Sequence, residues 1–118
     1  IVALAAHAQE PKDFTVAPVG AINKVLEKAG WTIADVDLFE VNEAFACVAM
    51  FAMHDLGIDR AKINVNGGGT ALGHPIGATG AMLIGTLVDE LERRDLQTGL
   101  VAMCTGGGMG TATIIERI

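Results

Sequence analysis

Hydrophobic positions along the chain follow two spacings, one typical of helices and one typical of buried strands. Apolar residues recur every three or four positions in three segments, which predicts helices over residues 18–28, 44–56 and 78–93. Short apolar runs predict five strands, over residues 1–7, 36–41, 63–65, 100–104 and 111–116. The predicted order of elements is therefore β-α-β-α-β-α-β-β.

The residues at the ends of the predicted helices support these boundaries. Pro18 suits the first turn of a helix, and Gly30 suits its end. The helix over 44–56 is almost wholly apolar, which predicts that it is buried, and Gly57 follows it.

Alternating strands and helices predict an α/β fold with a mixed, mostly parallel five-stranded sheet covered by helices. The last two strands are separated by a short glycine-rich connection, so we expect that pair to be antiparallel. A chain of 118 residues is expected to form one domain.

Three clusters of small and polar residues follow predicted strands, at 41–45, 66–80 and 104–110. The carboxyl ends of parallel strands meet at one edge of a sheet, so we expect the three clusters to converge there. Glycine lets the backbone approach a ligand closely. Together they predict a site in which backbone N–H groups and a few side chains surround a reacting carbonyl.

His74 is the candidate general base of this site. Pro75 disfavours helical backbone at His74, so the imidazole is expected to project from a loop just before the third helix. A helix N-terminus favours a neutral imidazole, which can accept a proton. The alternative is a structural histidine that binds loop carbonyl groups. His7 and His54 lack this setting and are interpreted as structural or surface residues.

Cys104 and Asn42 are the other candidate residues. Cys104 ends an apolar strand and precedes three glycines, so its thiol suits a nucleophile or proton carrier beside an oxyanion hole. A buried strand cysteine is the alternative. Asn42 has an amide that can hold a water or a carbonyl oxygen, and its alternative role is a helix N-cap. Glu43 is expected to interact favourably with a helix N-terminus.

Composition and motif spacing argue against several classes of function. The net charge of −6 argues against non-specific nucleic-acid binding, and no apolar run is long enough to span a bilayer. Two cysteines are too few for a disulfide framework and fit a reducing compartment, and Cys47 is interpreted as a small buried hydrophobic residue. The glycine loops lack the spacing of a P-loop or a dinucleotide fingerprint, and no close ligand pairs suggest a metal site.

The three clusters together resemble the signature blocks of the thiolases, the acetyl-CoA acetyltransferase and 3-ketoacyl-CoA thiolase enzymes. The resemblance covers residues 1–118 but corresponds only to the C-terminal domain of that family. It implies acyl transfer between acyl-CoA and CoA through an acyl-cysteine, by thiolytic cleavage of 3-oxoacyl-CoA or condensation of two acetyl-CoA. It further implies fatty acid metabolism, CoA thioesters as substrates without any other cofactor, a homodimer or homotetramer, and a cytoplasmic location.

The resemblance also implies a role for each candidate residue. His74 would activate the nucleophilic cysteine and share an oxyanion hole with a water held by Asn42. Cys104 would move the proton at the substrate α-carbon, and the N–H of Gly106 would line the second oxyanion hole. Phe45 would contact the substrate.

The nucleophilic cysteine of the family belongs to an N-terminal domain that residues 1–118 do not contain, so we expect this chain alone to be inactive. The chain begins at Ile1 inside an apolar stretch, which suggests a fragment or a processed chain. Two alternatives remain open: a non-catalytic thiolase-like binding or assembly domain, and a condensing enzyme similar to ketoacyl synthases. For the latter, a histidine or asparagine is expected at the position of Cys104.

Overall fold

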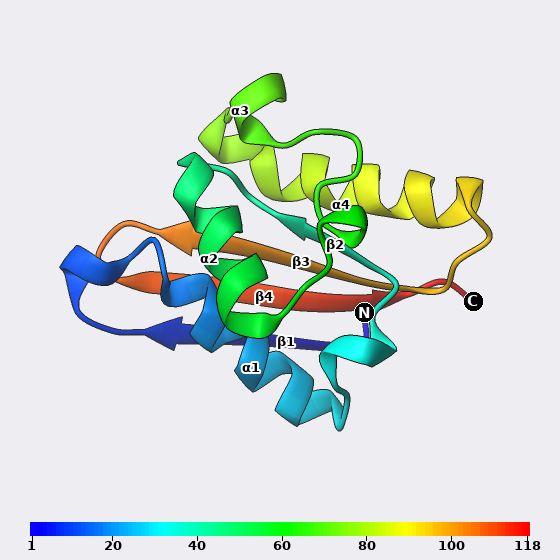
Figure 1. Ribbon diagram of the computed structural model, residues 1–118, viewed down its shortest axis with the longest axis horizontal. Coiled ribbons are helices and arrows are strands. Elements are labelled where there is room, and N and C mark those ends of the chain that lie inside the picture. The colour runs from blue at the N-terminus through cyan, green and yellow to red at the C-terminus, as the bar shows by residue number, and fades with distance from the viewer.

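A computed structural model describes all 118 residues and contains one four-stranded sheet with helices on both faces (Figure 1). Three single-turn 3-10 helices, Pro11–Asp13, Ile33–Asp35 and Arg60–Lys62, lie in the connections. The main elements, in chain order, are β1 (Ala3–Ala8), α1 (Ala17–Ala29), β2 (Leu38–Val41), α2 (Ala46–Leu56), α3 (Gly69–Leu72), α4 (Ile76–Arg93), β3 (Thr98–Thr105) and β4 (Met109–Glu116).

The strands are arranged in the order β1-β4-β3-β2. β2 pairs with β3 in parallel, whereas β4 is antiparallel to both of its neighbours, β3 and β1. The α/β class, the mixed sheet and the antiparallel final pair are therefore confirmed, but the prediction of a mostly parallel sheet is wrong. Three strands do point in the same direction. The last strand inserts between two of them, and periodicity carries no information about which strands become neighbours.

The prediction of a strand over residues 63–65, and so of a five-stranded sheet, is also wrong. Only Ile63 forms a bridge, to Phe39, and the next residue, Asn64, has a φ of 47° that no extended strand adopts. The Asn64 side chain instead takes over the pairing: its Oδ1 accepts from the Val41 N–H at 2.8 Å and its Nδ2 donates to the Val41 carbonyl at 2.9 Å. The amide of Asn64 thus binds the end of β2 as a neighbouring strand would.

Two hydrophobic clusters, one on each face of the sheet, hold the layers together. The larger one joins α1 and α2 to the sheet and includes Phe39, Leu100 and Ile114. The smaller one packs Leu83, Leu87 and Leu91 of α4 against β2 and β3, which confirms the inward stripe expected for this helix. Figure 1 shows α4 and α1 at opposite sides of the strands. No helix combines the length and the apolar character needed to cross a membrane.

Substitution of Asn64 tests whether its side chain secures the end of β2. Asn64→Asp should lower the free energy of unfolding by about 2–4 kcal/mol, because the carboxylate cannot donate to the buried Val41 carbonyl. Chemical denaturation measures the change. The matched control is Asn23→Asp on the exposed side of α1, which should change the stability by less than about 0.5 kcal/mol. Equal losses in the two variants would contradict the bridging role.

Candidate active site

The parallel pairing of β2 and β3 brings Asn42 and Cys104 to the same edge of the sheet. The backbone N–H of Asn42, the first residue after β2, donates to the Ala102 carbonyl of β3 at 2.9 Å. Cys104 lies two residues further along β3. The long loop with His74 reaches the same edge, since Asn64 at its start is bound to the end of β2. The convergence predicted from the sequence is thus observed.

Asn42 and His74 are in contact. Asn42 is 1% exposed, and its Nδ2 lies 3.5 Å from Nε2 of His74, at the long limit of a hydrogen bond. Helix α2 begins only at Ala46, with Phe45 in the N-cap position, so Asn42 is not a helix cap. Its amide faces the imidazole instead.

Thr79 fixes the tautomer of His74. Nδ1 of the imidazole lies 2.7 Å from Oγ1 of Thr79, and that hydroxyl donates its one proton to the Pro75 carbonyl at 3.1 Å. With that proton on the carbonyl, Oγ1 accepts from Nδ1–H. In the neutral ring this leaves the lone pair on Nε2, the nitrogen that faces Asn42. His74 is thereby arranged to accept a proton at Nε2 and then to donate from it.

Glu43 shapes the glycine loop around this pair. Its carboxylate accepts from Nδ2 of Asn64 at 3.0 Å and from the backbone N–H of Thr70 at 3.1 Å. Burial favours a higher pKa, but these hydrogen bonds and the charge of Arg60 outweigh it, so the pKa of Glu43 lies below its usual value. A Cβ at Gly68 would approach the carboxyl carbon of Glu43 to 2.4 Å, so a side chain there would displace this carboxylate from its hydrogen bonds. The expected interaction of Glu43 with a helix N-terminus is made with α3 rather than α2.

Cys104 is half-buried on the face of the sheet that α1 and α2 cover. Burial raises the pKa of its thiol, with a smaller contribution from the neighbouring thiol of Cys47. The side chain therefore carries its proton at neutral pH. Cys104 makes no hydrogen bond to His74 or Asn42 within the chain.

The turn after Cys104 exposes backbone donors. Gly107 and Gly108 have φ angles of 91° and 85°, and the turn is held in place by the Gln9 N–H, which donates to the Gly108 carbonyl at 2.9 Å. The N–H of Gly106 donates to no backbone carbonyl. A Cβ at Gly106 would meet nothing within 4 Å, so the space beside it is open.

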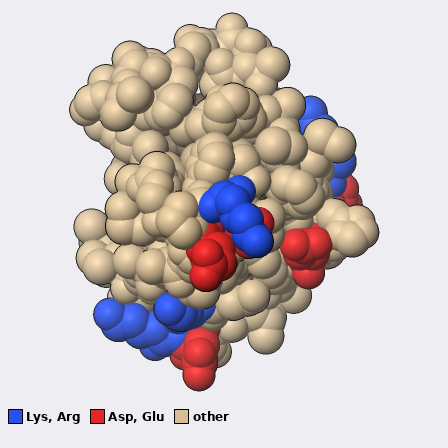
Figure 2. Space-filling model, turned by 90° about the vertical axis from the view of Figure 1, so that its left-hand side faces the viewer, with Lys and Arg blue, Asp and Glu red and all other residues tan.

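Few charges surround the site. The sequence has no Lys, Arg, Asp or Glu between Lys62 and Asp89 or between Asp95 and Glu116. Figure 2 looks onto the left-hand side of Figure 1, where the β3–β4 turn lies, and its upper left part shows no charged side chains. Phe45, predicted to bind substrate, is 57% exposed and packs edge-on against Phe14, with ring centroids 5.9 Å apart. No three His, Cys, Asp or Glu residues are grouped so as to hold a metal ion.

Two polar residues of the site escaped the sequence interpretation. Thr79 was only part of a motif, although its position five residues after His74 in the first turn of α4 is a usable signal. The sequence prediction places Glu40 within an apolar strand. A carboxyl in a strand that is otherwise apolar is unusual enough to mark a functional position, because ionised groups are costly to bury.

Comparison with known proteins decides the family. A family model described as "Thiolase, C-terminal domain" matches residues 1–117. The chain belongs to the thiolase family. Its similarity to the thiolases over residues 1–118, expected from the three clusters, is thus confirmed.

Relatives within the thiolase family carry the name acetyl-CoA acetyltransferase. The chain is 50% identical to that of Allochromatium vinosum and 48% identical to that of Rhizobium meliloti, over 118 residues in each case. The crystal structure of the Bacillus anthracis acetyl-CoA acetyltransferase superimposes with a TM-score of 0.97 at 46% identity over the whole chain. The chain spans 30% of the length of each of these three proteins.

Thr79→Val tests the assigned tautomer of this thiolase domain. The variant removes the acceptor of Nδ1–H, so the neutral imidazole should shift toward the tautomer with its proton on Nε2. The ¹⁵N chemical shifts of the His74 ring measure the two forms. Thr79→Ser retains the hydroxyl and should retain the Nδ1–H tautomer. A ring that keeps Nδ1–H in Thr79→Val would show that another group fixes it.

Proposed function

We propose that this domain supplies half of an active site for acyl transfer between acyl-CoA and CoA. The reaction is thiolytic cleavage of 3-oxoacyl-CoA, or its reverse, the condensation of two acetyl-CoA, through an acyl-cysteine. The contact between Nε2 of His74 and the Asn42 amide, with Thr79 fixing the ring, is the observation that carries the proposal. The names of the relatives support the substrate class.

In the first half-reaction, His74 accepts the proton of a nucleophilic cysteine at Nε2. The thiolate attacks the 3-oxo carbon of the substrate, and the carbonyl oxygen becomes an oxyanion. The new Nε2–H of His74 then faces that oxygen, and Nδ2 of Asn42 holds a water that donates the second hydrogen bond. The imidazole of His74 becomes a cation when it accepts the proton, whereas the water stays neutral. Both donors therefore stabilise the oxyanion more than they stabilise the uncharged carbonyl of the substrate.

Collapse of the tetrahedral intermediate breaks the bond between C2 and C3 and releases the enolate of acetyl-CoA. The Cys104 thiol donates its proton to the α-carbon of this enolate, while the N–H of Gly106 binds the enolate oxygen. The raised pKa of Cys104 suits a thiol that must carry its proton when the enolate forms. The resulting thiolate recovers its proton from the imidazolium of His74. The neutral His74 then accepts the proton of CoA, whose sulfur attacks the acyl-cysteine, and returns it to the released cysteine thiolate, so that both thiols are regenerated.

The nucleophile of this scheme lies outside the 118 residues. Cys47 occupies the first turn of α2, where no glycine loop supplies an oxyanion hole, so it is a poor candidate. The isolated chain is therefore inactive under this proposal, and an N-terminal thiolase domain completes the site.

The wider setting is proposed from the relatives and the surface. Mouse "Acetyl-CoA acetyltransferase, cytosolic" is 47% identical over 92% of the chain, which supports a cytoplasmic location. Large apolar side chains such as Met50, Leu72 and Ile76 are exposed, which supports burial of this surface in a larger homo-oligomeric protein. We place the reaction in fatty acid metabolism, where 3-oxoacyl-CoA is cleaved.

Two substitutions separate the half-reactions in the full-length gene product. His74→Ala should lower the rate of acyl-enzyme formation about 10³-fold, since it removes both the base and an oxyanion donor. Cys104→Ala should leave acyl-enzyme formation from acetyl-CoA intact and block condensation. Single-turnover mass spectrometry follows the first step, and formation of acetoacetyl-CoA in the steady state follows the second.

His54→Ala and Cys47→Ala are the matched controls, and neither should lower either rate by more than about threefold. His54 is exposed on α2 and Cys47 lies in the first turn of that helix. Equal loss of both half-reactions in Cys104→Ala would contradict the role assigned to that thiol.

A further inference from the structure

Glu40 is a buried carboxyl that the proposed reaction does not use. It lies on β2, is 2% exposed, and makes no side-chain hydrogen bond within the chain. Phe39 and Val41, its neighbours on the strand, belong to the cluster under α1 and α2, so Glu40 projects to the face that α4 covers. Burial of a carboxyl costs free energy, and buried carboxyls are rarely found without a hydrogen-bond partner.

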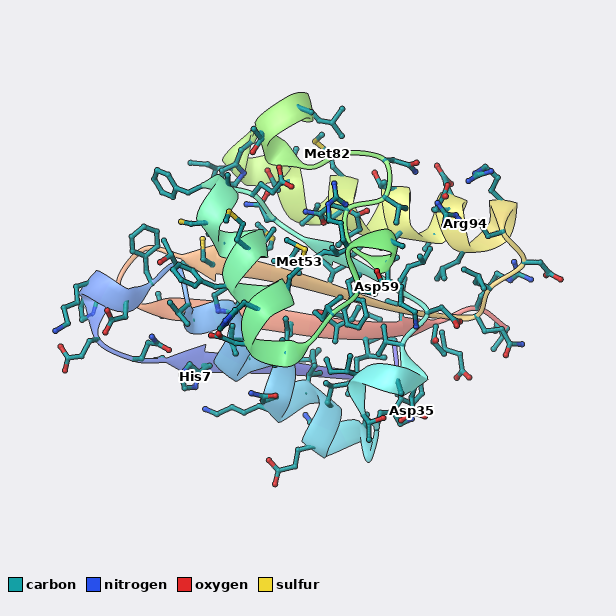
Figure 3. All side chains as sticks on the ribbon, in the orientation of Figure 1. His7, Asp35, Met53, Asp59, Met82 and Arg94 are labelled. Carbon is teal, nitrogen blue, oxygen red and sulfur yellow. The ribbon has the colours of Figure 1, made fainter.

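A cavity of about 30 Å³ adjoins this carboxyl, and its size suits a water molecule. The lining includes Glu40, Asn42, Thr79, Thr86 and the glycines of the loop. Met82 of α4 also lines it, and Figure 3 shows Met82 beside α3, at the opposite end of α4 from Arg94. The cavity therefore adjoins Asn42 at the end of α4 that lies near α3.

Asn42 also lacks a partner on the side of this cavity. Its Oδ1 is buried and accepts no hydrogen bond. Two nearby donors are already engaged: the Thr79 hydroxyl donates to the Pro75 carbonyl, and the Thr70 N–H donates to Glu43. The Glu40 carboxyl, which makes no side-chain hydrogen bond, and the unpartnered Asn42 oxygen thus belong to residues that line the same small cavity.

The charge around Glu40 disfavours its ionised form. Burial, reinforced by the nearby carboxylates of Glu43 and Glu90, raises the pKa of Glu40 to about 7. Arg93 and Arg94 are bound to Glu90, and the charge of Arg60 acts on Glu43, so no cation is left to pair with Glu40. A hydrogen-bonded neutral molecule is the partner that fits a carboxyl in this setting.

We propose that the cavity holds a water molecule through which Glu40 orients the Asn42 amide, which makes Glu40 a positioning residue of the oxyanion site. The role in catalysis rests on the function proposed above. The water donates one hydrogen to Oδ1 of Asn42. It accepts from Glu40 when that group is a carboxylic acid and donates to it when it is a carboxylate, and the Thr86 hydroxyl is available as a third partner.

The consequence of this bridge is a fixed direction of the Asn42 amide. The two ends of a carboxamide have nearly the same shape, so an amide without a defined partner rotates readily. With Oδ1 held toward the cavity, Nδ2 must face His74 and the oxyanion position. A reversed amide would present an oxygen to the oxyanion and destabilise it.

Kinetics of two Glu40 variants test the proposal in the full-length gene product. Glu40→Met fills similar space without polar atoms, and it should lower kcat about 10- to 100-fold with little change in KM, because the lost interaction acts in the transition state. Glu40→Gln retains partners for the water and should recover at least about tenfold of that loss. Asp89→Asn, an exposed carboxylate on α4, is the control and should match the wild type.

A crystal structure of the wild type that resolves ordered water tests the bridge independently of folding or activity of the variants. The water should lie about 2.7–3.2 Å from both Oδ1 of Asn42 and the Glu40 carboxyl. A dry cavity, or Glu40→Met with the kcat of the wild type, would overturn the proposal. Failure of the wild type to cleave acetoacetyl-CoA would instead contradict the proposed function. The crystal structure would still show whether the water bridges Glu40 and Asn42.

Discussion

The parallel pairing of β2 with β3 is the constraint on which the site depends. The hydrogen bond from the Asn42 N–H to the Ala102 carbonyl extends that pairing by one residue beyond β2, and so it sets the depth of the Asn42 side chain relative to Cys104. The Asn64 amide closes the other side of β2 at Val41. Asn42, the residue proposed to hold the oxyanion water, is thus fixed by a hydrogen bond from its own backbone on one side and by hydrogen bonds to the backbone of Val41 on the other.

Around this frame the polar groups of the site are organised in a surface with few charges. The Glu43 carboxylate accepts hydrogen bonds from Asn64 and from the Thr70 N–H, and Glu90 is held by Arg93, Asn66 and Arg94, which lower its pKa to about 2. An uncharged setting strengthens each hydrogen bond offered to a developing oxyanion, because the local dielectric constant is low. Glu40 is the exception, and the proposed water gives it a role that does not require a counter-ion.

Much of this arrangement was predictable from sequence. Apolar spacing located all three long helices and four strands, and the order of the clusters placed Asn42, His74 and Cys104 at one edge. Strand partners were not predictable, because the pairing of β1 with β4 depends on contacts between opposite ends of the chain. The failed strand at 63–65 shows a second limit: a side-chain amide can replace a backbone ladder, and periodicity does not distinguish the two. Thr79 gains its importance from the imidazole that folding brings to it, whereas Glu40 is marked by its place in an otherwise apolar strand.

The central claim is that these residues prepare an oxyanion site for a nucleophile supplied from elsewhere. The most direct test is to quench the full-length gene product during reaction with acetyl-CoA and to locate the acetyl group by peptide mass spectrometry. The account predicts acetylation of a cysteine outside residues 1–118, with Cys47 and Cys104 unmodified. An acetyl group on Cys104 would contradict it, because that thiol would then be the nucleophile rather than the carrier of the α-carbon proton.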